Sequence, residues 1–186
     1  NYIFSASYRR DASSRFAKDN RWGDFGSIGG AWVMSNENFF MAQSWIDFLK
    51  FKVSYGIQGN DALQYADGQT LNYYTYTDQY TVSESNGDFA TNLTYKGNQD
   101  ITWETSHSFN IGFDFTLLGG YLSGSAEYFS RKTSDMLYYM PVSPSHGYTE
   151  VPKNIGSVIN RGVELDLNST IINNKNFVWN VYANAT

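Results

Sequence analysis

Two acidic residues, Glu164 and Asp166, stand two positions apart in a stretch of alternating polar and apolar residues. On an extended strand this spacing places both carboxylates on one face, with Cα atoms about 6.6 Å apart. Carboxylate pairs separated by about 5–10 Å hydrolyse glycosidic bonds, so a glycoside hydrolase is one hypothesis. It requires that Glu164→Gln or Asp166→Asn abolish a measurable hydrolysis. Because nothing in the sequence supplies a buried acid, we favour two acids that line a polar interior.

The two histidines, His107 and His146, are the other residues with metal-binding or catalytic chemistry. Neither has a carboxylate or a second His at metal-ligand spacing, and the chain has no Cys to supply a thiolate. His107 falls on the apolar face of a predicted strand, and His146 in a loop rich in Pro, Ser and Gly. We therefore expect no catalytic residue, no metal and no cofactor.

Tyrosines gather in the connection 59–101, where four of the eight residues from 73 to 80 are Tyr. Connections longer than about 15 residues are usually functional or disordered. Tyr rings stack on sugars and pack against partner proteins, although self-packing within the loop is the alternative. A second candidate region lies around 140–144. The candidate substrate or partner contacts are Tyr73, Tyr74, Tyr76, Tyr80 and, in the connection 134–160, Tyr148.

Composition excludes several classes of protein. Aromatic residues make up 18% of the 186 residues, which argues against a disordered tail. A net charge of -5 argues against a polybasic nucleic-acid binder. No apolar run reaches about 18 residues, so no transmembrane helix is expected. The sequence lacks an initiating Met and opens inside a predicted strand, so it is either a mature product or a piece of something longer.

Alternation of apolar and polar residues dominates the chain and predicts strands. In 49–58 every odd-numbered residue is apolar and every even-numbered residue is polar or Gly. Helical periodicity is confined to 35–48, where Ser44 and Asp47 fit a capping box and one or two turns of helix are expected. The seven predicted strands span 2–9, 25–34, 49–58, 103–115, 121–131, 162–171 and 177–185.

The connections between these strands alternate in length. Those at 10–24, 59–101 and 134–160 are long, and those at 117–120 and 172–176 are short, whereas 35–48 fits this alternation poorly. In an antiparallel meander, alternate connections lie at the same end, so one end of the sheet should carry the long loops. Outer-membrane barrels have this asymmetry, and the strand lengths suit a tilted crossing of a bilayer. Seven strands do not close a bacterial barrel, which uses an even number, so we expect part of a larger barrel.

Several segments, in order along the chain, resemble the SusC/RagA-type TonB-dependent transporters. Ser5–Phe16 with Asn20–Gly23 is similar to the family's RxDxSSRF and NRWG stretch. The later Trp103–Phe115 is similar to its WExTxxxNIGxDF motif. The resemblance covers nearly the whole chain except 61–100. The other matching segments are 30–40, 44–60, 128–137 and 141–165.

The resemblance implies an antiparallel up-and-down transmembrane β-barrel of 22 strands, with long extracellular loops and mostly short periplasmic turns. Residues 1–186 would be part of a single barrel domain that crosses the outer membrane of a Gram-negative bacterium several times. The plug domain, the TonB box and the final strand would lie outside this sequence. The family imports oligosaccharides or peptides with a SusD-like surface lipoprotein, energised by TonB through regions absent here. Bond chemistry and a nucleic-acid partner are not expected.

The alternation then divides the strand residues between membrane lipid and a polar lumen. The alternative from another class is a secreted all-β carbohydrate-binding module that uses the Tyr-rich loop, and it would be a soluble monomer. A barrel segment would aggregate without detergent. The predicted lumen-facing residues are Lys50, Lys52, Asn110, Asp114, Glu127, Arg131, Glu164 and Asp166.

Overall fold

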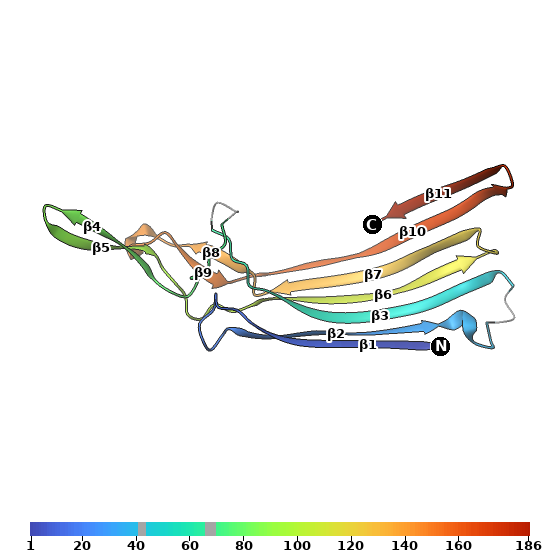
Figure 1. Cartoon of the computed structure of the whole chain (residues 1–186), viewed down its shortest axis with the longest axis horizontal. Coiled ribbons are helices and arrows are strands. Elements are labelled where there is room, and N and C mark those ends of the chain that lie inside the picture. The colour runs from blue at the N-terminus through green and yellow to red at the C-terminus, as the bar shows by residue number, and fades with distance from the viewer. Residues whose placement is uncertain (41–43, 66–69) are drawn as a thin grey trace.

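A seven-stranded antiparallel sheet, here called the main sheet, forms most of the structure (Figure 1). The computed structural model describes residues 1–40, 44–65 and 70–186. Neighbours in the sheet are consecutive main-sheet strands, so the topology is an open meander. In spatial order the strands are β1 (Tyr2–Ala12), β2 (Trp22–Val33), β3 (Ile46–Asn60), β6 (Glu104–Leu117), β7 (Leu122–Ser134), β10 (Ser157–Asn174) and β11 (Phe177–Ala185).

The seven predicted strands are confirmed, and most are longer than the alternation indicates. The strand β10, for example, begins at Ser157 rather than Gly162. The predicted separation of loops is also confirmed: the connections 13–21, 61–103 and 135–156 lie at one end of the sheet (Figure 1). The turn 118–121 at the other end is tight, with Leu118, Gly119 and Gly120 all at positive φ. Glycine takes that conformation without strain, which explains two glycines there.

The helix expected within 35–48 is not found among the described residues of that segment. Only a 3₁₀ turn, η1 (Met34–Asn36), follows β2. Asp47 lies inside β3, where its Oδ2 accepts a hydrogen bond from the backbone N–H of Gly120 at 3.1 Å. The capping-box prediction for Ser44 and Asp47 is therefore wrong. Pairing of Ile46 with Leu117 extends the sheet through this segment, and ladder hydrogen bonds replace the single bond of a cap.

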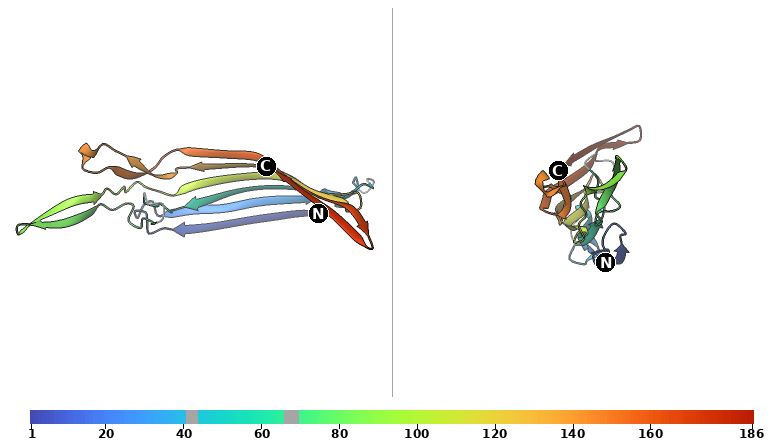
Figure 2. Two further views of the ribbon diagram at one scale, coloured as in Figure 1. Left: turned by 90° about the horizontal axis from the view of Figure 1, so that it is seen from above. Right: turned by 90° about the vertical axis from the view of Figure 1, so that its left-hand side faces the viewer.

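Two short hairpins occupy the long connections and were not predicted as strands. The first consists of β4 (Gln79–Ser85) and β5 (Asp88–Tyr95), and the second of β8 (Leu137–Pro141) and β9 (Glu150–Asn154) with η2 (Pro144–His146) between them. Both project from the same end of the main sheet (Figure 2). Asn86 and Gly87, both at positive φ, form the β4–β5 turn. An Asn-Gly pair is the preferred turn of a two-residue hairpin.

The buried core lies among the long connections, not against the main sheet. Phe16, Leu63 and Ile101 are 0%, 3% and 0% exposed and pack together. By contrast, Phe4 in β1 is 72% exposed. Among the described residues, no helix has the length and apolar character needed to cross a membrane. The main sheet therefore presents large apolar side chains outward, whereas the loop end has a small core of its own.

Candidate functional site

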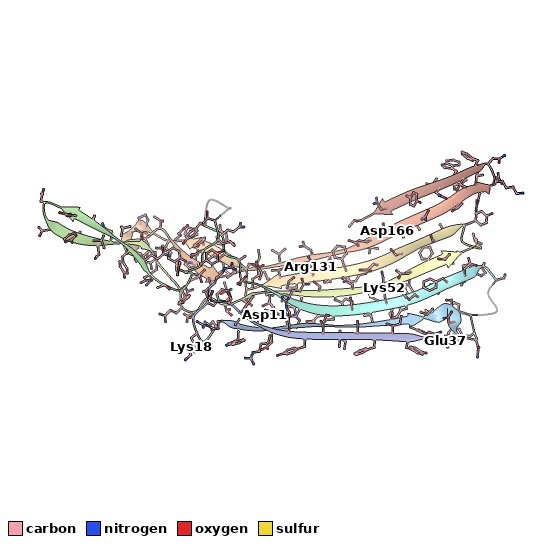
Figure 3. The ribbon with its side chains drawn as sticks, in the orientation of Figure 1. Asp11, Lys18, Glu37, Lys52, Arg131 and Asp166 are labelled. Atoms are coloured by element: carbon pink, nitrogen blue, oxygen red, sulfur yellow. The ribbon has the colours of Figure 1, made fainter. Side chains whose placement is uncertain are left out.

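The two faces of the main sheet differ in chemistry along its whole width. Because cross-strand neighbours share a face, the register Trp32–Phe51–Phe113 continues as one apolar row, and Phe51 and Phe113 rings lie 5.2 Å apart. The next row, one residue further along each strand, lies on the opposite face and contains Lys52, which pairs with Gly112. We call the first face the apolar face and the second the polar face. Figure 3 shows side chains of both faces along the strands.

An ion-pair network crosses three strands on the polar face. Lys50 and Lys52 of β3 both bond Asp114 of β6, with Nζ–O distances of 2.6 and 3.0 Å. Lys52 also reaches Glu127 of β7 at 2.9 Å, although β6 lies between them. The Lys52 side chain can cross β6 because the residue between Lys52 and Glu127 is Gly112, which has no side chain. The four charges therefore balance each other across the sheet.

The remaining predicted acids, Glu164 and Asp166, lie on β10 and are exposed. Glu164 stands directly opposite Glu127, and like charges in that position repel. Neither acid forms an ion pair with another described residue. Both side chains face solvent, whereas a glycosidase needs a desolvated general acid, so this part of the chain does not build such a site.

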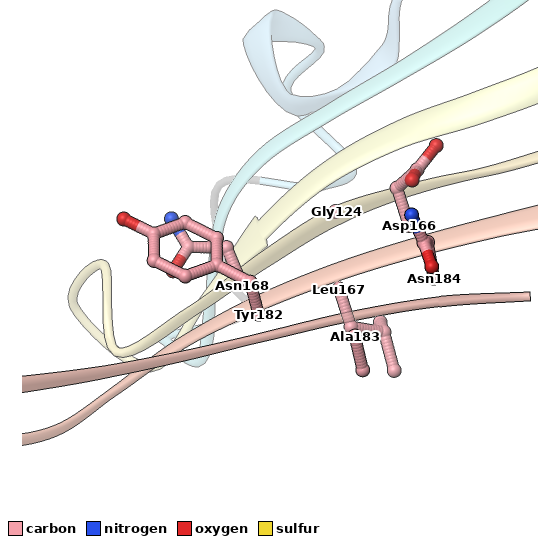
Figure 4. Close-up of a pocket in the computed structure, with 7 residues that line it drawn as sticks. All are labelled: Gly124, Asp166, Leu167, Asn168, Tyr182, Ala183 and Asn184. Carbon is pink, nitrogen blue, oxygen red and sulfur yellow. The ribbon is translucent and has the colours of Figure 1, made fainter.

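Asp166 borders a shallow groove between β10 and β11 (Figure 4). Asp166 and Asn184 project to one side of the sheet, and Leu167 and Ala183 project to the other (Figure 4). This separation follows from strand alternation. The groove is open, and its polar side is a continuation of the polar face.

The other two predicted polar-face residues join the same surface. Arg131 donates from Nε to Ser108 Oγ at 3.2 Å, across the β6–β7 ladder. Asn110 pairs with Ser54 in register, one row from the Lys52 network. All eight predicted lumen-facing residues thus belong to one face of one sheet. Their exposure to a lumen remains a prediction.

His107 lies on the apolar face, as the alternation indicates. Its Nδ1 is 2.7 Å from the hydroxyl of Tyr55 on the neighbouring strand. This contact gives the imidazole a polar partner on an otherwise apolar surface. His146 lies in η2, 6.0 Å from the ring of Tyr148. Among the described residues, no group of three His, Cys, Asp or Glu side chains is placed to hold a metal ion.

The three long connections are joined into one body, here called the loop cap, around Phe16, Leu63 and Ile101. Trp103 packs edge-on against Phe16 and Phe25, with centroids 5.5 and 5.1 Å away. The indole N–H of Trp103 donates to the carbonyl of Arg21 at 3.1 Å. One aromatic side chain thereby connects the first and second long connections.

Three Asn side chains, of which Asn72 is buried and Asn98 and Asn154 are half-buried, complete the joining of the loops. Asn98 Nδ2 donates to the carbonyl of Pro152 at 2.9 Å, and Asn72 Nδ2 to the hydroxyl of Tyr139 at 2.8 Å. Asn154 and the backbone of Thr102 exchange two bonds of 2.8 and 2.9 Å. Each bond links the connection 61–103 to the connection 135–156. Loss of the partner of Asn72 would leave a buried polar group without a hydrogen bond, which costs about 1–3 kcal/mol.

The Ser13–Phe16 segment fixes the first connection to the second. Arg15 forms a 2.7 Å ion pair with Asp61, and Ser13 Oγ donates to the same carboxylate at 2.6 Å. The Arg15 guanidinium also lies 4.9 Å from the ring centroid of Tyr73. Thr75 Oγ1 donates to the Arg15 carbonyl. The motif that carries the family resemblance is therefore an anchor between two loops.

The candidate tyrosines do not form one patch. Tyr73 and Tyr74 are exposed on the loop cap, whereas Tyr76 packs against the buried cluster. Tyr80 lies on the β4–β5 hairpin and is 59% exposed. Tyr148 lies between η2 and β9, in a different connection. A contact that used all five tyrosines would thus involve at least two separate surfaces.

Two tyrosines of the loop cap that the sequence did not single out form hydrogen bonds there, the buried Tyr95 and the half-buried Tyr139. Tyr95 donates to the carbonyl of Thr75 at 3.3 Å, and Tyr139 accepts from Asn72. Burial raises the pKa of both hydroxyls above the usual value for Tyr. The phenols therefore stay neutral and hold the loops together.

The chain matches, over residues 1–186, the family described as TonB dependent receptor-like, beta-barrel. Together with the open two-faced sheet, this match shows that the chain belongs to the TonB-dependent receptor β-barrel family. Proteins of this family are outer-membrane β-barrels, and the chain is a segment of such a barrel. The predicted family, fold class and location are confirmed.

Similar proteins place the chain within the SusC/RagA group. It is 35% identical over 96% of its length to TonB-dependent receptor P39 of Formosa agariphila, and 32% identical over its whole length to TonB-dependent receptor SusC of Bacteroides thetaiotaomicron. A solved structure of the RagAB peptide importer superposes on 98% of the chain with a TM-score of 0.82 and 33% identity. The chain spans 16%, 18% and 19% of these three proteins. Family membership leaves the secreted carbohydrate-binding module without support.

Proposed function

We propose that the chain is one arc of an outer-membrane active transporter that imports oligosaccharides or peptides. The observation that carries this proposal is the main sheet, which is apolar on one face, charged on the other and attached to a folded loop cap at one end only. The names of two similar proteins support it, since one is the receptor SusC and another is the RagAB peptide importer. The barrel of the complete protein has 22 strands, and residues 1–186 lie within this single barrel domain.

In this proposal the apolar face contacts lipid and the polar face lines the lumen. In a bilayer every backbone polar group must be paired, and a closed barrel achieves this. The edge strands β1 and β11 each have one neighbour among the described strands, so further strands would pair with them. The self-balanced network around Lys52 keeps its charges in the aqueous lumen without requiring counterions.

The partner in this proposal is a SusD-like surface lipoprotein that covers the barrel from outside. TonB supplies energy through regions outside these residues. The exposed Tyr73 and Tyr74 and the half-buried Tyr148 contact the lipoprotein or the substrate. The chain performs no bond chemistry in this proposal, because Glu164 and Asp166, the pair of acids at glycosidase spacing, are both exposed.

The test is an uptake assay in cells that express the full-length receptor. Deletion of the receptor should abolish uptake of either a fluorescent oligosaccharide mixture or a fluorescent peptide mixture, and a plasmid copy should restore it. Detergent extraction should also recover the receptor with a surface lipoprotein at equal stoichiometry. Unchanged uptake of both mixtures, with no lipoprotein recovered, would contradict the proposal.

A further inference from the structure

The β4–β5 hairpin has one apolar face and one polar face. Register places Tyr80 opposite Leu93, Val82 opposite Thr91 and Glu84 opposite Phe89, so these six side chains share a face. The alternate positions carry Thr81 with Asn92 and Ser83 with Ala90. On the first face Tyr80, Val82 and Phe89 are 59%, 66% and 74% exposed.

The base of this hairpin is anchored to the loop cap. Tyr95, at the end of β5, is 8% exposed and packs edge-on against Tyr65 and Tyr139. Asp78, just before β4, accepts bonds from Lys96 Nζ at 2.8 Å and from the Gly97 N–H at 2.9 Å. The direction of the hairpin is therefore set before anything binds it. A preorganised surface loses less entropy on association than a flexible one.

No described segment of this chain covers the apolar face. The hairpin extends beyond the β8–β9 hairpin and away from the main sheet (Figures 1 and 2). An isolated two-stranded hairpin is marginally stable in water, and a hydrophobic face normally packs against something. The large exposed side chains are contiguous across the two strands, which marks an interaction surface more strongly than scattered apolar residues do.

The charges of the hairpin indicate what covers it. Gln79–Tyr95 contains two acids, Glu84 and Asp88, and no Lys, Arg or His. Lys96, the nearest base, is already paired with Asp78. The acids repel the phosphates of lipopolysaccharide. They also repel a second copy of the same hairpin, in a chain that carries a net charge of -5.

We infer that the apolar face of the β4–β5 hairpin docks on a partner protein whose contact surface is an apolar strip bordered by Lys or Arg. This inference rests on the proposed function, in which the partner is the surface lipoprotein. Tyr80, Val82 and Phe89 form the centre of the contact. Glu84 lies beside Phe89 on the same face, and Asp88 lies at the turn on the opposite face. The aromatic rings are the residue types that dominate binding energy at protein interfaces.

Site-specific photo-crosslinking in the full-length receptor tests the inference. A photoreactive phenylalanine analogue is placed at Val82 or Phe89, and at Thr81 or Asn92 as matched controls on the opposite face. The receptor is irradiated in intact cells and extracted in detergent. Adducts with the stoichiometrically co-purifying lipoprotein are expected from positions 82 and 89, at least fivefold above those from 81 and 92.

Affinity measurements with the purified receptor and lipoprotein provide a second readout. The double variant Val82→Ser/Phe89→Ser should weaken binding at least tenfold, whereas Thr81→Ser/Asn92→Ser should change it less than twofold. Glu84→Gln/Asp88→Asn should slow association severalfold and reduce its dependence on salt. These effects do not require the hairpin to unfold, and the crosslinks report its position directly.

The failures of the two proposals are distinguishable. If the lipoprotein co-purifies but crosslinks equally from both faces or from neither, the docking inference is wrong and the transporter assignment stands. Adducts from position 82 or 89 with lipopolysaccharide or a second receptor would also overturn the inference. If no lipoprotein co-purifies and uptake is unchanged, the proposed function itself fails.

Discussion

The main sheet and the loop cap are built on opposite principles. Backbone ladders pair the strands of the main sheet, and few of its side chains are buried within this chain. In the loop cap, buried rings and amides specify the structure, and regular pairing is confined to short hairpins. The comparison between exposed Phe4 and buried Phe16 summarises the difference. We therefore expect the main sheet to tolerate change at many positions, whereas the cap depends on individual contacts.

Truncation of one Phe in each region should give the largest contrast. Phe16→Ala should destabilise the loop cap by about 3–5 kcal/mol, because it leaves a cavity at a fully buried site. Phe4→Ala, at a 72% exposed site, is the matched control and should have little effect on the cap. Limited proteolysis of the full-length receptor in detergent, followed by mass spectrometry, measures cleavage within 61–103.

The expected result is rapid cleavage in the Phe16→Ala receptor while heat-modifiable migration of the barrel on gels is retained. Equal protease resistance of both variants would contradict a separate loop core.

Small residues in the main sheet matter only where the backbone is close. A Cβ at Gly112 would lie 2.5 Å from the Ala126 carbonyl oxygen, whereas a Cβ at Gly30 would meet nothing nearer than 3.9 Å. Gly112→Ala should therefore cost about 1–3 kcal/mol through overpacking, and Gly30→Ala should be near neutral. Barrel unfolding in urea, followed by gel mobility, measures both. Equal urea midpoints for the two variants would show that the backbone around Gly112 leaves room for a Cβ.

The Arg15–Asp61 pair tests whether charge couples the first two long connections. The side chains are 16% and 28% exposed, so their ion pair is partly shielded from solvent. A double-mutant cycle with Arg15→Gln and Asp61→Asn should give a coupling energy of about 1–2 kcal/mol. Hydrogen exchange of the loop cap supplies the free energies. A coupling energy near zero would mean that the ring of Tyr73 and the backbone bond from Thr75 fix Arg15 alone.

A smaller effect is expected from pH at the base of the β4–β5 hairpin. Lys96 and the Gly97 N–H lower the pKa of Asp78 below its usual value of 3.8. The stabilisation is therefore fully present above pH 3.8 and is lost as the pH falls through the lower pKa of the folded state. Hydrogen exchange at the Gly97 amide should accelerate in that range beyond its intrinsic rate. Asp78→Asn should remove the extra acceleration, and an unchanged pH profile in that variant would refute the assignment.

The main sheet was largely predictable because alternation is a local property. The alternation in 49–58 predicts β3, and the same pattern in 103–115 and 162–171 predicts β6 and β10. The β4–β5 hairpin also has a local signal, since Asn86-Gly87 follows the alternating Tyr80 and Val82, but the sequence analysis predicts only a long connection over 59–101. The helix prediction at 35–48 failed because tertiary pairing of Ile46 outweighed a local cap.

The loop cap could not be predicted from local patterns. Burial of Asn72 depends on Tyr139, 67 positions away, and that of Thr75 on the backbone of Arg15. No periodicity encodes such partners. The residues of the polar face were predictable as a set, but the bridge from Lys52 over Gly112 to Glu127 required the register of three strands.

The most direct test of the account is the environment of two adjacent residues of β3. Because the chain has no Cys, single Cys substitutions at Val53 and Ser54 can each carry a fluorophore in the full-length receptor, reconstituted in bilayers after replacement of any Cys outside this segment. Val53 pairs with Ile111 on the apolar face, and Ser54 with Asn110 on the polar face. Brominated lipid should quench the label at 53 several times more than the label at 54. Equal quenching at both sites, or the reverse order, would contradict a sheet with one face toward lipid and one toward the lumen.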